Sequence, residues 1–173
     1  EEFTFQKARV DDIHVLEQLH NNTMNKLDIS AVRDVDIWNY LLTQADNLSE
    51  LQETWLVQDK NNDTIGYVRI AQQGFAQGLI VDEASYLSYD AAIAVLYWLK
   101  KMGQEKHKPN IRLSMSDTSS LMTIAKAWGA KYRKRYAWQV KVPNPARLLQ
   151  QIVPVLEQRI KNSPFENLTR SLI

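Results

Sequence analysis

The sequence predicts an α/β (α+β) domain, and three observations support that fold class. Short runs with alternating apolar residues, typical of half-buried strands, are separated by stretches whose apolar residues recur every three or four positions, as in amphipathic helices. The strand-like runs 54–59 and 64–72 are joined by the polar turn 60–63, which predicts an antiparallel hairpin. Residues 89–106 form a long, strongly apolar helical pattern that follows the short buried run 79–81.

The first part of the chain is expected to add one strand and two helices to that hairpin. Residues 3–10 alternate apolar and polar side chains, so we expect a strand with one buried face. A helix should follow, because two aspartates that could cap it precede apolar residues at helical spacing. A second helix is expected at about 35–45, with Asp34 or Asp36 as its cap.

The remaining elements alternate between strands and helices. Residues 111–115 alternate as a strand, and the helix expected after them should end at Gly129. The run 132–142 predicts the last long strand. A final amphipathic helix is expected to begin at Asn144, and Pro154 should kink or split it.

Length and composition exclude several classes of protein. The 173 residues suit one globular domain, and 21 basic against 20 acidic residues leave a net charge of +1, so bulk charge does not indicate a nucleic-acid or membrane-surface protein. Cysteine is absent, which excludes disulfides and a cysteine nucleophile. The five glycines form no phosphate-binding loop motif. No apolar run approaches the roughly 20 residues of a membrane span, so we expect a cytoplasmic protein.

Neither the histidines nor the basic residues indicate a site on their own. His14, His20 and His107 have no acidic residue at metal-ligand spacing, so we expect three solvated histidines and no metal site. A basic cluster with interleaved tyrosines lies at 131–136, and it leaves a polyanion-binding module open as an alternative. Strand alternation would divide these charges between two faces, which favours a charged strand start and no nucleic-acid partner. The cluster comprises Lys131, Arg133, Lys134 and Arg135.

All five tryptophans fall at apolar positions of expected elements. We therefore expect them to be anchors of the core or of a domain interface. An aromatic-lined ligand cavity in which some of them meet remains open. The five are Trp38, Trp55, Trp98, Trp128 and Trp138.

The order of elements and three segments resemble the GNAT (Gcn5-related N-acetyltransferase) superfamily. IGYVRI at 65–70 resembles its third strand, and residues 78–99 stand where its cofactor-binding strand and helix belong. Residues 120–142 resemble its fourth helix and last strands. The resemblance implies a GNAT-like acyl-CoA N-acyltransferase fold over residues 1–142, with a mixed, mostly antiparallel sheet flanked by helices, and acetyl-CoA as the cofactor of the family.

Two further segments carry a narrower resemblance. Residues 136–160 resemble the passage that leads out of the acetyltransferase-like domains in multi-domain proteins of the enhanced-intracellular-survival type, and RDVDIWNYLL at 33–42 is similar to the opening of their second GNAT unit. The chain is then expected to be a fragment containing the second, degenerate unit. Residues 143–173 would form a linker helix and the start of a following domain. Neighbouring domains and a further copy of the chain are the partners this implies.

The resemblance also implies where acetyl-CoA would bind. The family position corresponds to Ile80, Val81, Ser88 and Tyr89, with the pyrophosphate at a turn that family members line with glycine. The corresponding turn, 82–90, has no glycine, no lysine or arginine, and three carboxylates. Carboxylates in the turn that would hold the pyrophosphate repel it, so we expect the domain not to bind acetyl-CoA.

The family's general acid is missing as well. Members commonly carry a tyrosine four residues before the glycine that ends the fourth helix, and that position is Ala125. Tyr132 is the nearest phenol that could substitute for it, although strand alternation favours a packing role. We therefore expect a non-catalytic module of a larger acetyltransferase. The alternative is an active acetyl-CoA-dependent N-acetyltransferase of a small amine with a non-standard cofactor loop, so whether the chain is an enzyme stays open.

Overall fold

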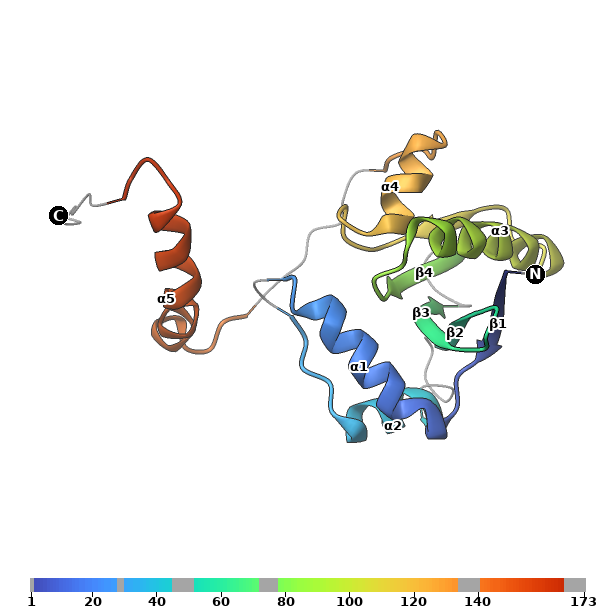
Figure 1. The fold of residues 1–173 in the computed structure, drawn as a ribbon, viewed down its shortest axis with the longest axis horizontal. Coiled ribbons are helices and arrows are strands. Elements are labelled where there is room, and N and C mark those ends of the chain that lie inside the picture. The colour runs from blue at the N-terminus through green and yellow to red at the C-terminus, as the bar shows by residue number, and fades with distance from the viewer. Residues whose placement is uncertain (1, 28–29, 45–51, 72–77, 134–140, 167–173) are drawn as a thin grey trace. The chain divides into compact units, whose positions relative to one another are not determined.

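A computed structural model describes residues 2–27, 30–44, 52–71, 78–133 and 141–166 of the chain (Figure 1). The chain divides into two compact units, Glu1–Tyr132 and Arg133–Ile173. The first unit contains the sheet and the helices that cover it, and the second contains one described helix.

Within the described residues, five strands form one sheet in the order β1-β2-β3-β4-β5. The first four strands pair antiparallel with their neighbours, and β5 pairs parallel with β4. The expected mixed, mostly antiparallel sheet is therefore confirmed. The strands are β1 (Phe3–Lys7), β2 (Gln52–Asp59), β3 (Thr64–Ala71), β4 (Leu79–Ala84) and β5 (Ile111–Leu113).

The expected hairpin is β2–β3, and a single aspartate organises its turn. The carboxylate of Asp59 accepts hydrogen bonds from the amides of Asn61 at 2.9 Å and Asp63 at 3.0 Å. Asn62 adopts a positive φ of 65°, a conformation that asparagine tolerates better than most residues. The polar run between the two strands thus forms the turn through its own side chains.

Helices cover both faces of the sheet (Figure 1). The face under α3 is packed with apolar side chains, and the opposite face carries α1 and α2. The helices of this unit are a short 3₁₀ turn (Val10–Asp12), α1 (Ile13–Met24), α2 (Val35–Thr43), α3 (Tyr89–Glu105) and α4 (Ser120–Ala127).

The caps of α1 and α2 differ from each other. Asp34 caps α2 as expected, because its carboxylate accepts a hydrogen bond from the amide of Ile37 at 2.9 Å. The expected aspartate cap on α1 is wrong. The chain first makes the 3₁₀ turn, and Asp12 accepts from the amide of Arg9 at 2.8 Å instead of from α1. The helix therefore begins at Ile13, after the turn that Asp12 stabilises.

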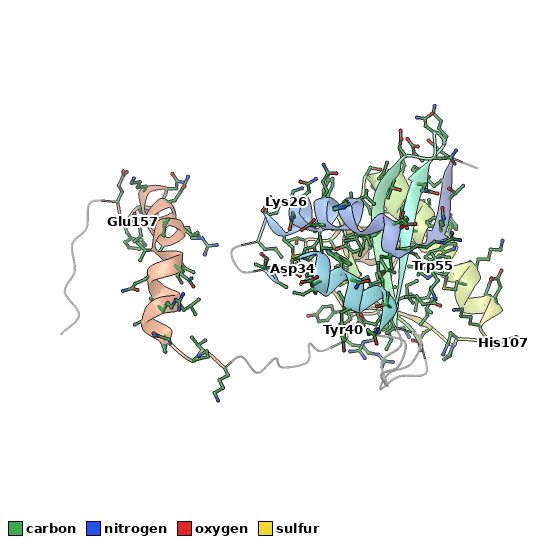
Figure 2. The ribbon with its side chains drawn as sticks, turned by 90° about the horizontal axis from the view of Figure 1, so that it is seen from below. Lys26, Asp34, Tyr40, Trp55, His107 and Glu157 are labelled. Atoms are coloured by element: carbon green, nitrogen blue, oxygen red, sulfur yellow. The ribbon has the colours of Figure 1, made fainter. Side chains whose placement is uncertain are left out.

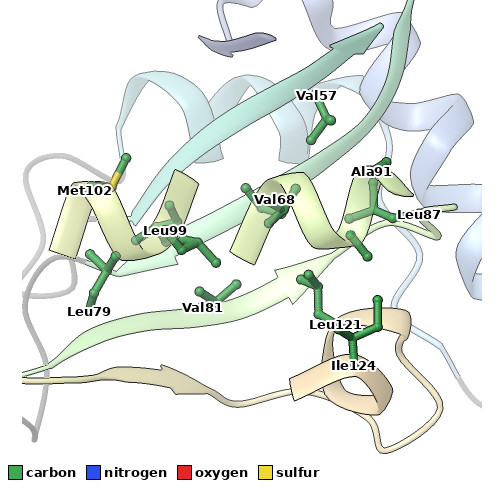
Figure 3. Packing of buried hydrophobic residues seen from close by; sticks show 13 residues of the cluster. Val57, Val68, Leu79, Val81, Leu87, Ala91, Leu99, Met102, Leu121 and Ile124 are labelled. Atoms are coloured by element: carbon green, nitrogen blue, oxygen red, sulfur yellow. The ribbon is translucent and has the colours of Figure 1, made fainter. Parts of the chain in front are cut away.

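The core on the α3 face is almost entirely apolar (Figure 3). Side chains from β2, β3 and β4 meet one face of α3, and α4 adds two residues from the side. Burial of this surface, worth about 25 cal/mol per Å² of apolar area, holds α3 on the sheet. The buried members include Val57, Val68, Ile70, Leu79, Val81, Leu87, Val95, Leu99, Leu121 and Ile124.

The end of α4 agrees with the sequence, but the start of the last expected strand does not. Gly129 adopts φ 85°, and the amide of Ala130 donates to the carbonyl of Ala125 at 2.9 Å, as in a glycine-terminated helix. Residues 132 and 133 form no strand, so the expected strand start is wrong. The greater part of that strand, residues 134–140, lies outside the described residues.

In the second unit, α5 (Pro145–Lys161) begins as expected. Asn144 accepts a hydrogen bond from the amide of Arg147 at 2.9 Å, and proline occupies the first turn. The helix continues through Pro154 without being split. Its apolar stripe is exposed, notably at Leu149 and Ile160. None of the helices in the described ranges is long and apolar enough to cross a membrane.

Candidate functional site

The position where the GNAT resemblance expects the cofactor is the connection between β4 and α3. β4 pairs with β5 only over Leu79–Val81, and the amide of Ser114 adds a last bond to the Val81 carbonyl at 2.8 Å. Beyond Val81 the strand pairs with β3 alone, ending at the pair Val68 and Ala84. Ile80 and Val81 are therefore buried strand residues just before β4 and β5 separate.

Backbone amides of this connection already donate hydrogen bonds to the protein. The amide of Ser85 donates to the Tyr67 carbonyl at 3.0 Å, and that of Tyr86 donates to the hydroxyl of Thr23 at 2.8 Å. The hydroxyl of Ser88 caps α3 by accepting from the Ala91 amide at 3.3 Å. Of these three amides, only that of Ala91 belongs to the first turn of α3, where a helix N-terminus would bind phosphate, and it already donates to Ser88.

Side chains of the connection also fill the space beside the sheet. Leu87 is only 2% exposed and packs within the core on the α3 face (Figure 3). A Cβ built on Gly66 would lie 2.3 Å from Leu87 Cδ2, so the glycine on β3 leaves the room that this leucine occupies. The hydroxyl of Ser85 is buried and accepts from the Tyr67 amide at 2.9 Å. The connection is closed by its own residues.

The structure changes the electrostatic argument made from the sequence. β4 extends to Ala84, so Asp82 and Glu83 are strand residues and not part of a turn facing α3. Asp82 accepts from the side-chain amide of Gln52 at 3.1 Å, and Glu83 is bound on the opposite face of the sheet. Only Asp90 stands in the first turn of α3. Of the three carboxylates, only that of Asp90 therefore stands where the sequence analysis expected repulsion of a phosphate.

The residues named for general acid chemistry lie at the end of α4 and beyond it. Ala125 is a helix residue and offers no acidic proton. Tyr132 is 61% exposed and follows α4 outside any described strand, and its packing role stays a prediction. Tyr89, at the start of α3, is also mostly exposed.

A second site, not expected from the sequence, lies on the α1/α2 face of the sheet and is centred on Glu83. Arg33, which precedes α2, holds the carboxylate with two hydrogen bonds of 2.7 and 2.6 Å. The hydroxyl of Tyr67 on β3 donates to Glu83 Oε1 at 2.5 Å. The bidentate pair of Arg33 and Glu83 is the strongest form of the arginine–carboxylate contact, and it links the α1–α2 connection to β4.

His20 of α1 completes this group, and its burial corrects the expectation of three solvated histidines. The ring is 1% exposed. Its Nε2 lies 3.0 Å from the Ala31 carbonyl, which can only accept, so Nε2 carries a hydrogen. Its Nδ1 lies 3.1 Å from the Tyr67 hydroxyl.

The contacts of Glu83 decide its protonation. Burial alone would raise the pKa of this carboxyl, but the neighbouring His20, 3.7 Å away, and the hydrogen bonds from Arg33 and Tyr67 outweigh burial and hold the pKa well below its usual range. Burial and the neighbouring Glu83 charge raise the pKa of Tyr67, so the phenol stays protonated at neutral pH. A general base works best with a pKa near the operating pH. Glu83 is thus a weak base and a strong structural clamp.

Sequence reasoning did not identify this group, although one signal was available. His20 lies four residues after Leu16 and seven after Ile13, which places it on the buried stripe of α1. Arg33 and Glu83 are 50 positions apart, and no local spacing predicts their contact. Within the described ranges, no three metal-ligating side chains come together in a metal-binding arrangement.

The aromatic residues divide between the core and a surface groove. Trp38 is fully buried, and Trp98 stacks on Phe5 with ring centroids 4.5 Å apart. Trp98 also lines a shallow groove of about 540 Å³ between β1 and α3, together with Tyr97. Trp128 is half-exposed against Tyr97, and Trp138 lies outside the described residues. Core anchoring is thus confirmed for Trp38, and the groove is the nearest counterpart of an aromatic-lined cavity.

The basic cluster is only partly described. Lys131 and Arg133 are exposed, and Lys134 and Arg135 lie outside the described residues. The side of the molecule to which each charge points is therefore still a prediction.

Comparison with solved structures identifies the fold. A ribosomal-protein-alanine N-acetyltransferase from Brucella melitensis biovar Abortus 2308 has 15% identity and a TM-score of 0.62, with 83% of this chain and 100% of that chain covered. A predicted acetyltransferase with acetyl-CoA from Clostridium acetobutylicum has 19% identity and a TM-score of 0.54, with 81% and 96% covered. No family model and no curated protein matches the sequence.

A third similar structure is a tandem GNAT protein from the clavulanic acid biosynthesis pathway. It has 14% identity and a TM-score of 0.53, and the match covers 74% of this chain but 43% of that one. Identities of this size establish the fold alone. The chain therefore has the GNAT fold, and the expected fold class is confirmed. The resemblance to the second unit of an enhanced-intracellular-survival-type protein remains a prediction.

Proposed function

We propose that this chain is a GNAT-fold module of a larger N-acetyltransferase and does not itself transfer acetyl groups. The observation that carries the proposal is the state of the β4–α3 connection. There the amides of Ser85, Tyr86 and Ala91 donate to acceptors of the protein itself. A pyrophosphate would have to displace those acceptors before it could bind.

The chemistry of the acceptor side supports the same proposal. The carboxylate of Glu83 is occupied by Arg33 and Tyr67, and its lowered pKa makes it a poor acceptor for the proton of an attacking amine. Ala125 stands where the family resemblance places the general acid. A cofactor that did bind would meet neither partner of an acid–base pair at these positions.

A structural role within a larger assembly is the remaining part of the proposal. The apolar stripe of α5 is exposed at Leu149, Val153 and Ile160, and such a stripe is normally covered by another surface. We propose that neighbouring domains of the same protein, or a second copy of the chain, cover such surfaces. The module would then contribute a wall of a substrate site or an oligomer contact.

Calorimetric titration of the chain with acetyl-CoA tests the proposal. We expect no saturable heat at micromolar concentrations. The informative variant is Ser88→Gly, which removes the capping hydroxyl from the Ala91 amide and should allow a weak interaction to appear. Ser119→Gly is the matched control, because Ser119 precedes α4 and makes no side-chain cap. A micromolar dissociation constant for the unmodified chain would overturn the proposal.

An activity assay distinguishes the proposed non-catalytic module from the alternative, an active enzyme with a rebuilt cofactor loop. Acetyl-CoA is mixed with polyamine, aminoglycoside or peptide amines, and release of the free thiol is followed. We expect the rate to equal that without protein. Thiol release that requires the amine and disappears in Tyr132→Phe would establish the alternative and assign the general acid.

A further inference from the structure

The outer edge of β1 is unpaired within the part of the chain that the structure describes. β1 is the first strand of the sheet, and β2 is its only described neighbour. The amide of Ala8, directly after β1, donates to the Thr54 carbonyl at 2.9 Å. Hydrogen-bonded positions alternate along an antiparallel pair of strands. The amides and carbonyls of Phe3 and Phe5 therefore point away from β2, towards the open edge.

A groove of about 540 Å³ lies beside this edge, between β1 and α3. Phe3 and Phe5 line it from β1, and Tyr97 and Trp98 line it from α3. The ring of Tyr97 is mostly exposed, so the groove presents apolar surface to solvent. An open strand edge next to exposed apolar surface is a typical contact for another chain.

β1 and α3 run in the same direction along the groove. At one level, Phe5 stacks on Trp98 with ring centroids 4.5 Å apart. Further along both elements, Lys7 at the end of β1 and Lys106 after α3 share the carboxylate of Glu53, at 3.2 and 3.8 Å. Later residues of the strand therefore lie beside later residues of the helix.

The two ends of the groove carry opposite charges. Glu2 precedes β1 and Asp90 stands in the first turn of α3, so these two lining carboxylates belong to one end. Lys101, which also lines the groove, follows Asp90 by three helical turns, about 16 Å along the helix. A surface with an acidic end and a basic end is complementary to a second copy of itself in the antiparallel orientation.

The strand and the helix are compatible with the same two-fold axis. The stack of Phe5 on Trp98 fixes their relative level. One strand residue rises about 3.4 Å and one helix residue about 1.5 Å, so Thr4 lies level with a point a little over two residues before Trp98. That point is midway between Asp90 and Lys101 on α3.

We propose that β1 pairs antiparallel with β1 of a second copy of this chain, about a two-fold axis at Thr4. In this register Phe3 of each copy stands opposite Phe5 of the other, and their outward amides and carbonyls hydrogen-bond to one another. Thr4 stands opposite Thr4 of the second copy. Aromatic pairs and threonine pairs both stabilise antiparallel strands. The groove end with Asp90 then lies on the same side as the Lys101 end of the second copy.

This inference deepens the proposed function, because it gives a surface and a partner to the oligomer contact proposed for the module. It rests on that part of the proposal alone. Self-association is measured without acetyl-CoA, so a monomeric chain would leave the acetyl-CoA titration as informative as before. A chain that binds acetyl-CoA could equally form this dimer.

A single introduced cysteine tests the register, because the chain has no cysteine of its own. Thr4→Cys places it on the two-fold axis, where directly opposed, non-hydrogen-bonded positions have Cα atoms about 4.5 Å apart, within reach of a disulfide. We expect mild air oxidation to give a covalent dimer in non-reducing electrophoresis. Gln6→Cys is the matched control on the same face of β1. Its two copies would stand about 14 Å apart, too far to cross-link.

Sedimentation velocity of the full chain measures the association without a cross-link. We expect a reversible monomer–dimer equilibrium. Lys101→Glu should weaken the dimer about tenfold, because the two-fold axis brings like charges together twice. Combining Asp90→Lys with Lys101→Asp should restore most of the affinity. Lys100→Glu changes an exposed lysine that does not line the groove, so this matched control should leave the equilibrium unchanged.

Three results would overturn the inference. The first is a chain that sediments as a monomer at the highest concentration at which it stays in solution. The second is equal cross-linking of Thr4→Cys and Gln6→Cys, which would contradict the register. The third is a dimer that Lys101→Glu does not weaken, because the contact would then involve another surface, such as α5.

Discussion

The two faces of the sheet are stabilised in different ways. On the α3 face, side chains such as Val68, Val81 and Leu99 are fully buried and apolar. On the α1/α2 face, Leu16 and Trp38 share the interior with a buried histidine, a buried arginine and an arginine–carboxylate pair. Figure 2 shows the side chains of the α1/α2 region, with Asp34 and Tyr40 labelled at α2.

The difference shows where the specificity of the fold resides. An apolar core accepts many residues of similar volume, because dispersion and burial do not depend on direction. The cluster around Glu83 depends on direction, since each donor must meet one oxygen. It therefore fixes the position of α1 and the α1–α2 connection relative to β3 and β4. By contrast, α3 is held on the sheet by the burial of apolar surface.

The largest expected effect is the removal of the charge on the polar face. Glu83→Gln keeps the shape of the side chain but leaves Arg33 without its bound carboxylate. We expect the free energy of unfolding to fall by about 3–5 kcal/mol, measured by urea denaturation. Asp90→Asn, in the first turn of α3, is the matched control and should change stability by about 0.5 kcal/mol. Equal effects of the two substitutions would contradict the clamp.

Acid should weaken the polar face before the apolar one. Because the pKa of Glu83 is held below its unfolded value, its contribution is fully present above about pH 4.3, the ordinary pKa of glutamate, and is lost as the pH falls towards the folded pKa. Denaturation curves at pH 7, 5 and 3 measure this loss. Glu83→Gln should lose less stability between pH 5 and pH 3 than the unmodified chain. Parallel curves for the two proteins would show that Glu83 does not couple to pH.

On the apolar face, the corresponding substitution is Leu99→Ala. It removes a fully buried side chain of α3 and leaves a cavity against the sheet. We expect a loss of about 3 kcal/mol in the free energy of unfolding, with no change in its dependence on pH. Tyr97→Ala, on the exposed side of the same helix, should cost far less. An acid-dependent loss in Leu99→Ala would mean that the two faces are not independent.

Arg69→Met should change stability in the opposite direction. Burial is the largest influence on Arg69 and its ion pair with Glu83 is long, at 4.0 Å, so replacing it with an apolar side chain of similar length removes a desolvation cost and we expect a gain of about 1–2 kcal/mol. Thermal unfolding in chloride buffer measures the gain. A clear loss of stability would show that Arg69 supports the fold in the ligand-free protein.

The smallest expected effect concerns the cap of α3. Ser88→Ala removes the acceptor of the Ala91 amide, and we expect a loss of about 1 kcal/mol in the free energy of unfolding. Ser88→Gly should lose less, because glycine lets water reach the amide. Urea denaturation of both variants distinguishes the cap from the other interactions of the connection.

Much of the fold could be predicted because the relevant information is local. The hairpin turn, the cap of α2 by Asp34 and the glycine end of α4 each depend on residues within a few positions of one another. The apolar face of α3 follows from its periodicity. Resemblance to the GNAT superfamily located the expected cofactor position on β4 and α3. It did not predict which hydrogen bonds the residues at that position make.

The expectations that failed depend on which residues meet across the chain. His20 was expected to be solvated, because no acidic residue lies at metal-ligand spacing from it, but its position on the buried stripe of α1 places it in the interior. Asp82 and Glu83 were expected to face a phosphate, but β4 extends further and turns them away from α3. In each case a partner distant in sequence decided the outcome.

The sequence by itself determined the order of the described elements, the cap of α2, the glycine end of α4 and the apolar periodicity, because these follow from local backbone propensity and from the burial of one face. Only the tertiary structure decided which charged side chains are buried and which residues they contact. Arg33 and Tyr67 hydrogen-bond Glu83 from different elements, whereas Arg69 approaches it only to 4.0 Å. The physical reason is that hydrogen bonds and ion pairs act over a few ångströms, and the chain brings those atoms within reach only after the sheet and helices have packed.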